Sequence, residues 1–150
     1  MVSSSPPPAE LPELPLVLRP RRTRAVLLGT GGAGLVVLTV IAVALPVGGM
    51  VDRVSIVATG LLILGVLALL SRPSVTADQD GVTVVNLTTR RRLEWAEIVR
   101  VNLRSGDPWA HLDLADGTSL PAMGIQPGGG RQQAVEAARA LRALVEAHGA

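Results

Sequence analysis

The sequence contains no cysteine, and its only aromatic residues are Trp95 and Trp109. Without cysteine the chain cannot form disulfide bonds, zinc–thiolate centres or thiol nucleophiles. Hydrophobic residues still make up 48% of its 150 residues, so the apolar side chains are almost all aliphatic. We expect both tryptophans, together with Ile98, to anchor the core of the folded domain, because a buried aromatic ring contributes a large apolar area. The alternative is a ring that faces the membrane or a partner.

An excess of positive charge is also missing from most of the chain. Residues 71–150 hold nine arginines and nine acidic residues, so this region is neutral, and the surplus arginines lie between residues 19 and 24. Nucleic-acid binding draws much of its affinity from the neutralisation of phosphates. We therefore expect no nucleic-acid partner.

Two long segments carry no charged side chain at all, residues 25–51 and residues 54–71. A helix needs about 20 apolar residues to cross a bilayer. The sequence therefore predicts a transmembrane hairpin over residues 25–71, with helices at about 25–45 and 50–70. Pro46, Gly48 and Gly49 mark the turn between them, and Asp52 and Arg53 are expected at the membrane interface. The lipid bilayer is the first partner that the sequence predicts, and a protein partner or self-association in the membrane is the second.

The orientation of the hairpin follows from the arginines. The cluster at residues 19–24 adjoins the first span, whereas the loop between the spans offers only Arg53. The positive-inside rule then predicts a protein of the plasma membrane with both termini in the cytoplasm. The alternative is a signal peptide cleaved after residues 42–44, which would also leave the C-terminal domain in the cytoplasm.

A glycine pattern within the first span has two interpretations. Residues 29–34 match the G-x-G-x-x-G fingerprint of dinucleotide-binding proteins, and Asp52 follows about 20 residues later. However, a crossover helix needs a polar face, and residues 35–51 are uncharged. We interpret the pattern as part of a membrane helix whose small residues, such as Gly29 and Ala33, permit close helix packing. A membrane-bound nucleotide-dependent enzyme is the remote alternative.

The N-terminal arm, residues 1–24, is rich in proline and arginine. Proline at this density opposes helices and sheet ladders. We expect a disordered cytoplasmic tail, with a polyproline ligand for a partner as the alternative. Its arginines would attract anionic lipids by roughly 1 kcal/mol each.

After the hairpin the periodicity changes to that of short strands. Alternating or β-branched runs predict six strands, at residues 74–78, 82–87, 91–95, 99–103, 110–114 and 118–123. Gly81 is expected to supply a positive φ in the first turn. Residues 131–148 then predict a helix with an apolar stripe made of Val135, Ala138, Leu141, Leu144 and Val145. The predicted fold is a small α+β domain at residues 72–150, an antiparallel sandwich or part-open barrel capped by one C-terminal helix.

A set of short motifs in this region resembles a known family. Val75-Thr-Ala-Asp78, Asp80-Gly-Val82, Asn86, Arg91-Arg-Leu-Glu-Trp-Ala-Glu-Ile98, Gly106-Asp-Pro-Trp-Ala110 and Asp116-Gly117 resemble the bacterial PH-domain family of actinobacterial membrane proteins. That family includes low-molecular-weight protein antigen 6. The resemblance covers residues 25–125 and implies a PH-like fold behind two membrane helices. It supplies no catalytic or ligand residues, and the antigen name leaves release from the cell open.

Residues able to carry out chemistry are few. His111 and Asp113 share one face of a predicted strand and supply at most two metal ligands, so we expect a solvated face and no catalytic, cofactor or metal site. Arg90, Arg91 and Arg92 are predicted at a hairpin tip, where they form a solvated turn or contact anionic lipid. We predict a non-enzymatic membrane protein that presents a cytoplasmic PH-like binding or scaffolding domain, with no small-molecule substrate. The alternative is a lipid-sensing domain that uses the three arginines.

Overall fold

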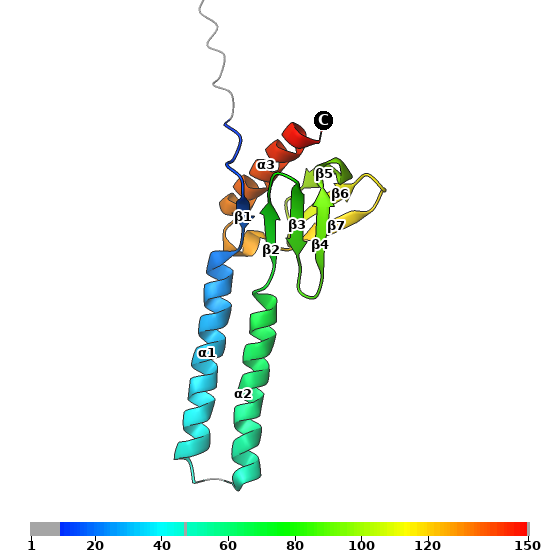
Figure 1. Ribbon diagram of the computed structural model, residues 1–150. Helices are drawn as coiled ribbons and strands as arrows, with labels where there is room; N and C mark the ends of the chain where they lie inside the picture. Colours follow the sequence, from blue (N-terminus) through cyan, green and yellow to red (C-terminus); the bar gives the residue numbers. More distant parts are fainter. Residues whose placement is uncertain (1–9, 47, 150) are drawn as a thin grey trace, which may run out of the picture.

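The computed structural model describes residues 10–46 and 48–149. They form a long two-helix hairpin and, above it in Figure 1, a small domain of strands and one helix. In chain order the elements are β1 (Leu16–Leu18), α1 (Arg21–Ala44), α2 (Met50–Leu70), β2 (Ser74–Ala77), β3 (Gly81–Val85), β4 (Arg90–Glu94), the 3₁₀ turn η1 (Trp95–Glu97), β5 (Ile98–Asn102), β6 (Ala110–Leu114), β7 (Ser119–Ala122), the 3₁₀ turn η2 (Pro127–Gly129) and α3 (Arg131–His148).

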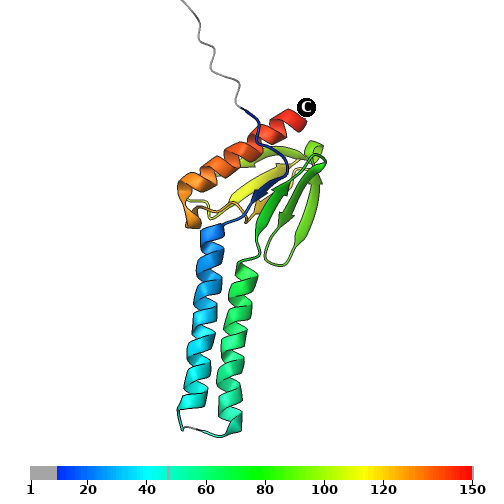
Figure 2. The ribbon, with the colours of Figure 1, turned by 60° about the vertical axis from the view of Figure 1, so that its left-hand side comes forward.

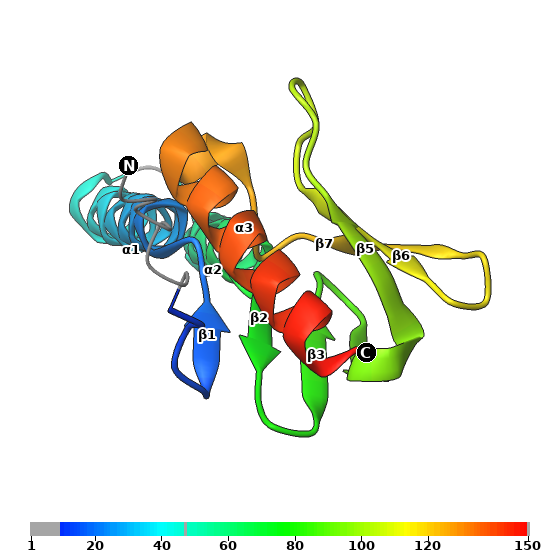
Figure 3. The same cartoon turned by 90° about the horizontal axis from the view of Figure 1, so that it is seen from above.

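The domain consists of two antiparallel sheets and one helix. The first sheet has the order β1-β2-β3-β4 and the second has the order β5-β6-β7. Helix α3 lies across the sheets, and the view along the hairpin axis shows the second sheet standing beside the first (Figure 3). The predicted fold class, two apolar helices followed by a PH-like sandwich with a C-terminal helix, is confirmed.

The core of the domain lies between the sheets and α3. Leu93, Leu112 and Leu141 are fully buried there, one from each sheet and one from the helix. The apolar stripe of α3 differs from the prediction at its start, because Ala134 is buried whereas Val135 is 38% exposed. The buried positions 134, 138, 141 and 145 are spaced by three or four residues, as one face of a helix requires.

Strand β1 corrects the expectation that residues 1–24 form a disordered tail. β1 pairs with β2 in antiparallel register, with Leu16 opposite Ala77 and Leu18 opposite Val75. The side chains of Leu16 and Leu18 pack against the core, and this burial stabilises a three-residue strand between prolines. The remaining part of the predicted tail, residues 1–9, lies outside the described residues.

The position of β1 also moves the boundary of the domain, which had been expected to begin at residue 72. One strand comes from before the helices and the other strands come from after them. The hairpin is thus inserted between the first and second strands of the domain. Both of its helices leave from the same end of the sheet (Figure 1).

The two helices agree closely with the predicted spans, although α1 begins earlier, at Arg21. Both are long and apolar enough to cross a membrane. In the most apolar 18-residue segment of each helix, only 11% and 6% of the residues are buried. The core helix of a water-soluble protein would be mostly buried instead. The apolar side chains of this hairpin are therefore exposed on nearly every side, a pattern that suggests association with a membrane.

The contact between the helices depends on one glycine from each. A Cβ atom on Gly31 would lie 2.9 Å from Leu64 Cδ1, and one on Gly60 would lie 2.9 Å from Leu35 Cδ1. Each glycine therefore receives a leucine from the other helix. The expectation that Gly29 and Ala33 form this contact is wrong, because nothing lies within 4 Å of a Cβ on Gly29 and Ala33 is exposed.

The turn between the helices explains the two charged residues near it. The Asp52 carboxylate accepts a hydrogen bond from the Gly49 backbone N–H at 2.9 Å. A carboxylate in the first turn of a helix also stabilises the positive end of the helix dipole. Asp52 therefore caps α2 and is not the distant acidic residue of a nucleotide site.

Candidate functional site

The three arginines of the predicted hairpin tip lie within strand β4, and the turn itself is formed by residues 86–89. Arg90, Arg91 and Arg92 stand opposite Val85, Val84 and Thr83. Because neighbouring side chains of a strand point to opposite faces, Arg91 shares a face with buried Leu93 while Arg90 and Arg92 share the other. The three guanidinium groups therefore do not form one patch.

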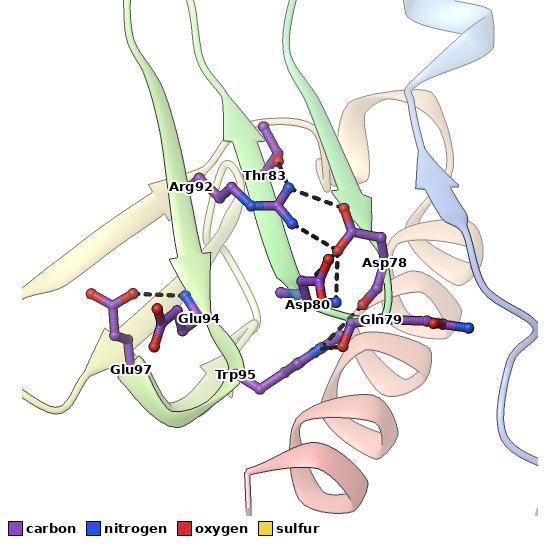
Figure 4. Close-up of polar contacts among 9 residues, drawn as sticks. Asp78, Gln79, Asp80, Thr83, Arg92, Glu94, Trp95 and Glu97 are labelled. Atoms are coloured by element: carbon purple, nitrogen blue, oxygen red, sulfur yellow. Dashed lines mark hydrogen bonds and ion pairs between the residues drawn. The ribbon is translucent and has the colours of Figure 1, made fainter.

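Arg92, in the middle of β4, is held in an ion pair with Asp78 (Figure 4). Its Nη2 lies 2.9 Å from Asp78 Oδ1, and its Nη1 donates to Asp78 Oδ2 at 3.0 Å and to Thr83 Oγ1 at 3.2 Å. These bonds lower the pKa of the Asp78 carboxyl and raise the pKa of Arg92. The two-pronged geometry is the favoured one for arginine and carboxylate.

Asp78 also organises the turn between β2 and β3. Its Oδ1 accepts hydrogen bonds from the backbone N–H groups of Asp80 and Gly81 at 2.9 and 3.0 Å. Gly81 has no positive φ, contrary to the prediction. A Cβ at Gly81 would lie 2.0 Å from the carbonyl oxygen of Leu93, so glycine is needed there because the neighbouring strand approaches so closely.

Trp95 is hydrogen-bonded to the same β2–β3 turn. Its ring is 6% exposed, and its Nε1–H donates to the carbonyl oxygens of Asp78 and Gln79 at 3.1 and 3.2 Å (Figure 4). The ring also stacks on His148 of α3 with a centroid distance of 4.8 Å. Trp95 thus joins a turn of the first sheet to the end of the helix. Ile98, 4% exposed, belongs to the same core.

Trp109 differs from the expectation of a core anchor. It is half-buried and does not belong to the core cluster. Ala110, Leu112 and Leu114 are the buried residues of β6, so the side chains between them point the other way, and Trp109 directly precedes this alternation.

His111 and Asp113 are half-buried on the outer face of β6. Asp113 accepts a hydrogen bond from Asn102 Nδ2 on the neighbouring strand. Within residues 10–46 and 48–149, no group of three or more histidine and acidic side chains gathers as a metal site would require. The arrangement is that of a polar cross-strand pair.

Asn86 is a polar residue whose role the sequence pattern did not reveal. It is 6% exposed, its Nδ2 donates to the carbonyl oxygen of Pro121 at 2.8 Å, and its Oδ1 accepts from the Met123 N–H at 3.1 Å. Both partners lie in or just after β7, so Asn86 joins the two sheets. The partners are more than thirty residues away, and no local signal in the sequence indicates such a bond.

Basic side chains are concentrated at the end of the domain where the two helices begin. Arg19, Arg21, Arg22, Arg24 and Arg72 are exposed beside the two connections, and the β3–β4 turn with Arg90 points to the same end (Figures 1 and 2). Asp78 and Asp80 lie in the turn at the opposite end of β2 and β3. Positive charge is therefore concentrated where an apolar hairpin begins, and this end is the candidate functional surface.

Arg91 has a different neighbourhood, near Asp116 in the turn between β6 and β7. The pKa of Asp116 is lowered first by hydrogen bonds from Thr118, and more weakly by the charge of Arg91. Arg91 therefore contributes to the electrostatics of the second sheet.

The domain is similar to one known family and to two mycobacterial proteins. Residues 72–144 match the family described as the bacterial PH domain. The chain is similar to uncharacterized protein Rv1417 of Mycobacterium tuberculosis and uncharacterized protein Mb1452 of Mycobacterium bovis, with 36% identity over 93 residues in each case. The matches cover 62% of this chain and 56% of each relative, so the chain spans little more than half the length of these relatives. No solved structure matches the chain.

Proposed function

We propose that this protein is a membrane-anchored, non-enzymatic PH module that binds a protein partner at the inner face of the plasma membrane, because residues 72–144 match the bacterial PH domain family. The apolar hairpin is the anchor. The domain is the binding part, and its ligand is a partner protein or a second copy of the chain.

The pairing of β1 with β2 is the observation that carries the proposal. Residues 16–18 and residues 75–77 are neighbours in one sheet, although the whole hairpin separates them in the chain. This pairing supports a topology in which both ends of the hairpin lie on one side of the bilayer. This geometry supports an uncleaved hairpin, because cleavage after residues 42–44 would sever β1 from the rest of the chain.

The distribution of the arginines indicates on which side of the membrane the domain lies. Arg19, Arg21, Arg22 and Arg24 lie at the domain end, whereas the opposite end carries Arg53 beside Asp52. The positive-inside rule then places the domain and both ends of the chain in the cytoplasm.

The family and the contacts of the polar groups support a role without catalysis. Asn86 joins the two sheets, and Asp78 and Arg92 bond to each other within the first sheet, so these polar groups are engaged in holding the fold. The glycine pattern at residues 29–34 lies in the middle of α1, with no strand directly before it. A Rossmann-type phosphate site requires a strand, a tight turn and the start of a helix, so the nucleotide-dependent alternative has no support in this geometry.

The lipid-sensing alternative has one supporting observation, which is the location of Arg90 at the end where the helices leave. Arg92 already pairs with Asp78, and Arg91 faces the other side of the strand. A lipid role that uses β4 would therefore depend on Arg90 more than on its two neighbours.

Thiol labelling in intact cells tests the proposed topology. Because the chain has no cysteine, the variants Glu10→Cys, Met50→Cys and Ser105→Cys each carry a single reactive thiol. A membrane-impermeant maleimide should label only Met50→Cys in intact cells, and all three after permeabilisation. Labelling of Ser105→Cys in intact cells would contradict the cytoplasmic location, and release of the protein by alkaline carbonate would contradict the membrane anchor.

A further inference from the structure

A cavity lies between β1, the first turn of α1 and the segment that joins β7 to α3. Its volume is about 290 Å³. The apolar residues Ile125, Ala134 and Ala137 line it, together with the polar residues Gln126 and Gln133. Figure 2 shows this region, where the start of α3 comes close to the top of α1. The cavity is therefore located where the domain and the hairpin join.

Three arginines line the cavity, and no acidic residue does. They are Arg19, Arg21 and Arg22. Within residues 10–46 and 48–149, their side chains make no hydrogen bond or ion pair, whereas Arg92, Arg131 and Arg142 all donate to a partner. The first turns of α1 and α3 also lack a side-chain cap and an acidic residue, so their dipoles add positive potential. The cavity is an unneutralised cationic site.

The cavity also lies at a defined depth relative to the apolar hairpin. Arg21 and Arg22 are the first residues of α1, and the uncharged segment begins at residue 25. At 1.5 Å per residue the arginines are about 6 Å or less from the start of that segment along the helix axis. In a membrane, this is the level of the lipid headgroups.

We propose that this cavity binds the phosphate of an anionic phospholipid and thereby fixes the angle between the domain and the membrane. The guanidinium groups of Arg19, Arg21 and Arg22 bind the phosphate oxygens in the two-pronged manner that arginine favours. The apolar wall accommodates the glycerol end of the headgroup. This inference rests on the proposed function, because it requires the hairpin to be in the bilayer.

The test measures lipid retention by the full-length protein in detergent, using native mass spectrometry. Phosphatidylglycerol and phosphatidylcholine of equal chain length are the two lipid probes, and inorganic phosphate is the third probe. We expect one phosphatidylglycerol per chain to be retained in preference to phosphatidylcholine. Replacing all three arginines by Gln should weaken that retention by roughly a hundredfold, at about 1 kcal/mol for each charge removed.

Three further variants separate a bound headgroup from general attraction to charge. The variant with Arg100, Arg104 and Arg139 replaced by Gln loses the same charge from exposed positions elsewhere and should retain phosphatidylglycerol. Ala137→Leu fills the cavity without a change of charge and should reduce retention. Replacing the three cavity arginines by Lys keeps the charge but removes the paired donors, so it should restore only part of the binding.

Several results would overturn the inference. Equal retention of the two lipids would do so, as would retention unchanged in the Gln triple variant or in Ala137→Leu. Tight binding of inorganic phosphate that lipid does not displace would identify a soluble anion as the ligand and exclude the lipid. Tryptophan emission checks that each variant is folded. Carbonate extraction separates the two failures, because a protein that stays in the membrane but retains no anionic lipid contradicts only this inference.

Discussion

The hairpin and the domain use the same aliphatic side chains in opposite ways. Leu62 on α2 is 69% exposed, whereas Leu141 on α3 is fully buried. In the domain, burial of apolar side chains away from water drives folding. In the hairpin, most apolar side chains point outward and only a narrow seam of contact joins the helices, which fits the proposed location in a bilayer.

The polar groups differ between the two regions in the same way. In the domain, polar side chains such as Asn86 and Asp78 join strands that are far apart in the sequence. In the hairpin, Thr39, Ser55 and Thr59 each donate to a backbone carbonyl of their own helix. Because lipid offers no hydrogen-bond partners, a spanning helix must satisfy its polar groups within itself. Each region thus has the polar contacts that suit its surroundings, water for the domain and, as proposed above, lipid for the hairpin.

The same leucine substitution in both regions should give the largest contrast. Leu141→Ala leaves a cavity in the core and should destabilise the domain by about 2–5 kcal/mol. Leu62→Ala removes a side chain from the outer face of α2 and should leave the domain unchanged. Urea denaturation of the detergent-solubilised protein, followed by tryptophan emission, measures both, and equal shifts of the midpoint would contradict the contrast.

Asn86→Ala should give the next largest effect, because it leaves the Pro121 carbonyl and the Met123 N–H without their partner. Buried groups that lose a hydrogen bond cost about 1–3 kcal/mol. Asn102→Ala, which breaks a bond to Asp113 on the outer face of the second sheet, is the matched control and should cost less. The same urea titration compares them, and a larger loss in the control would refute the role of Asn86 in joining the sheets.

A leucine at Gly60 should disturb the hairpin and leave the domain intact. The new side chain would meet Leu35 and Leu38 of α1, and overpacking of this kind costs about 1–3 kcal/mol. Gly65→Leu on the same helix is the control, since nothing lies within 4 Å of its Cβ position. Spin labels on Val37→Cys and Leu62→Cys should move apart in Gly60→Leu and remain in place in Gly65→Leu.

The smallest effect should be the acid sensitivity of the Arg92–Asp78 pair. The pKa of Asp78 in the folded domain lies below its ordinary value of 3.8. The ionised carboxylate therefore stabilises the fold above that value, and this contribution is lost as the pH falls through the lowered pKa. Asp78→Asn should lower the urea midpoint at pH 7 and converge with the wild type in acid. Arg92→Gln should behave similarly, and a difference that grows in acid would contradict the assignment.

The sequence predicted the regions where its own pattern is local. Uncharged runs located both helices, alternation located six strands, and the apolar stripe located α3. It could not predict β1, because three residues between prolines form a strand only when β2 is present beside them, and the hairpin separates the two in the chain. For the same reason Asn86 and the helix contact at Gly31 and Gly60 were not predicted, since each depends on a partner distant in the sequence.

The same limit applies to the candidate site. The arginine clusters were visible in the sequence, but their availability was not. The partner of Arg92 lies across the sheet in the β2–β3 turn, and the cavity beside Arg19, Arg21 and Arg22 is formed partly by residues 124–137. Only the folded arrangement separates arginines that already have a partner from those that face a cavity.

A strand from before the hairpin completes the domain that follows it. The most direct measurement is disulfide formation in membranes between Val17→Cys and Thr76→Cys, which stand directly opposite each other in β1 and β2 and therefore have a Cα separation suited to a disulfide, about 4.5–5.5 Å. We predict rapid crosslinking on mild oxidation of the membrane-inserted protein, and none for the pair Val17→Cys and Ser105→Cys. Failure of the first pair to crosslink, with the hairpin inserted and the domain folded, would contradict the claim.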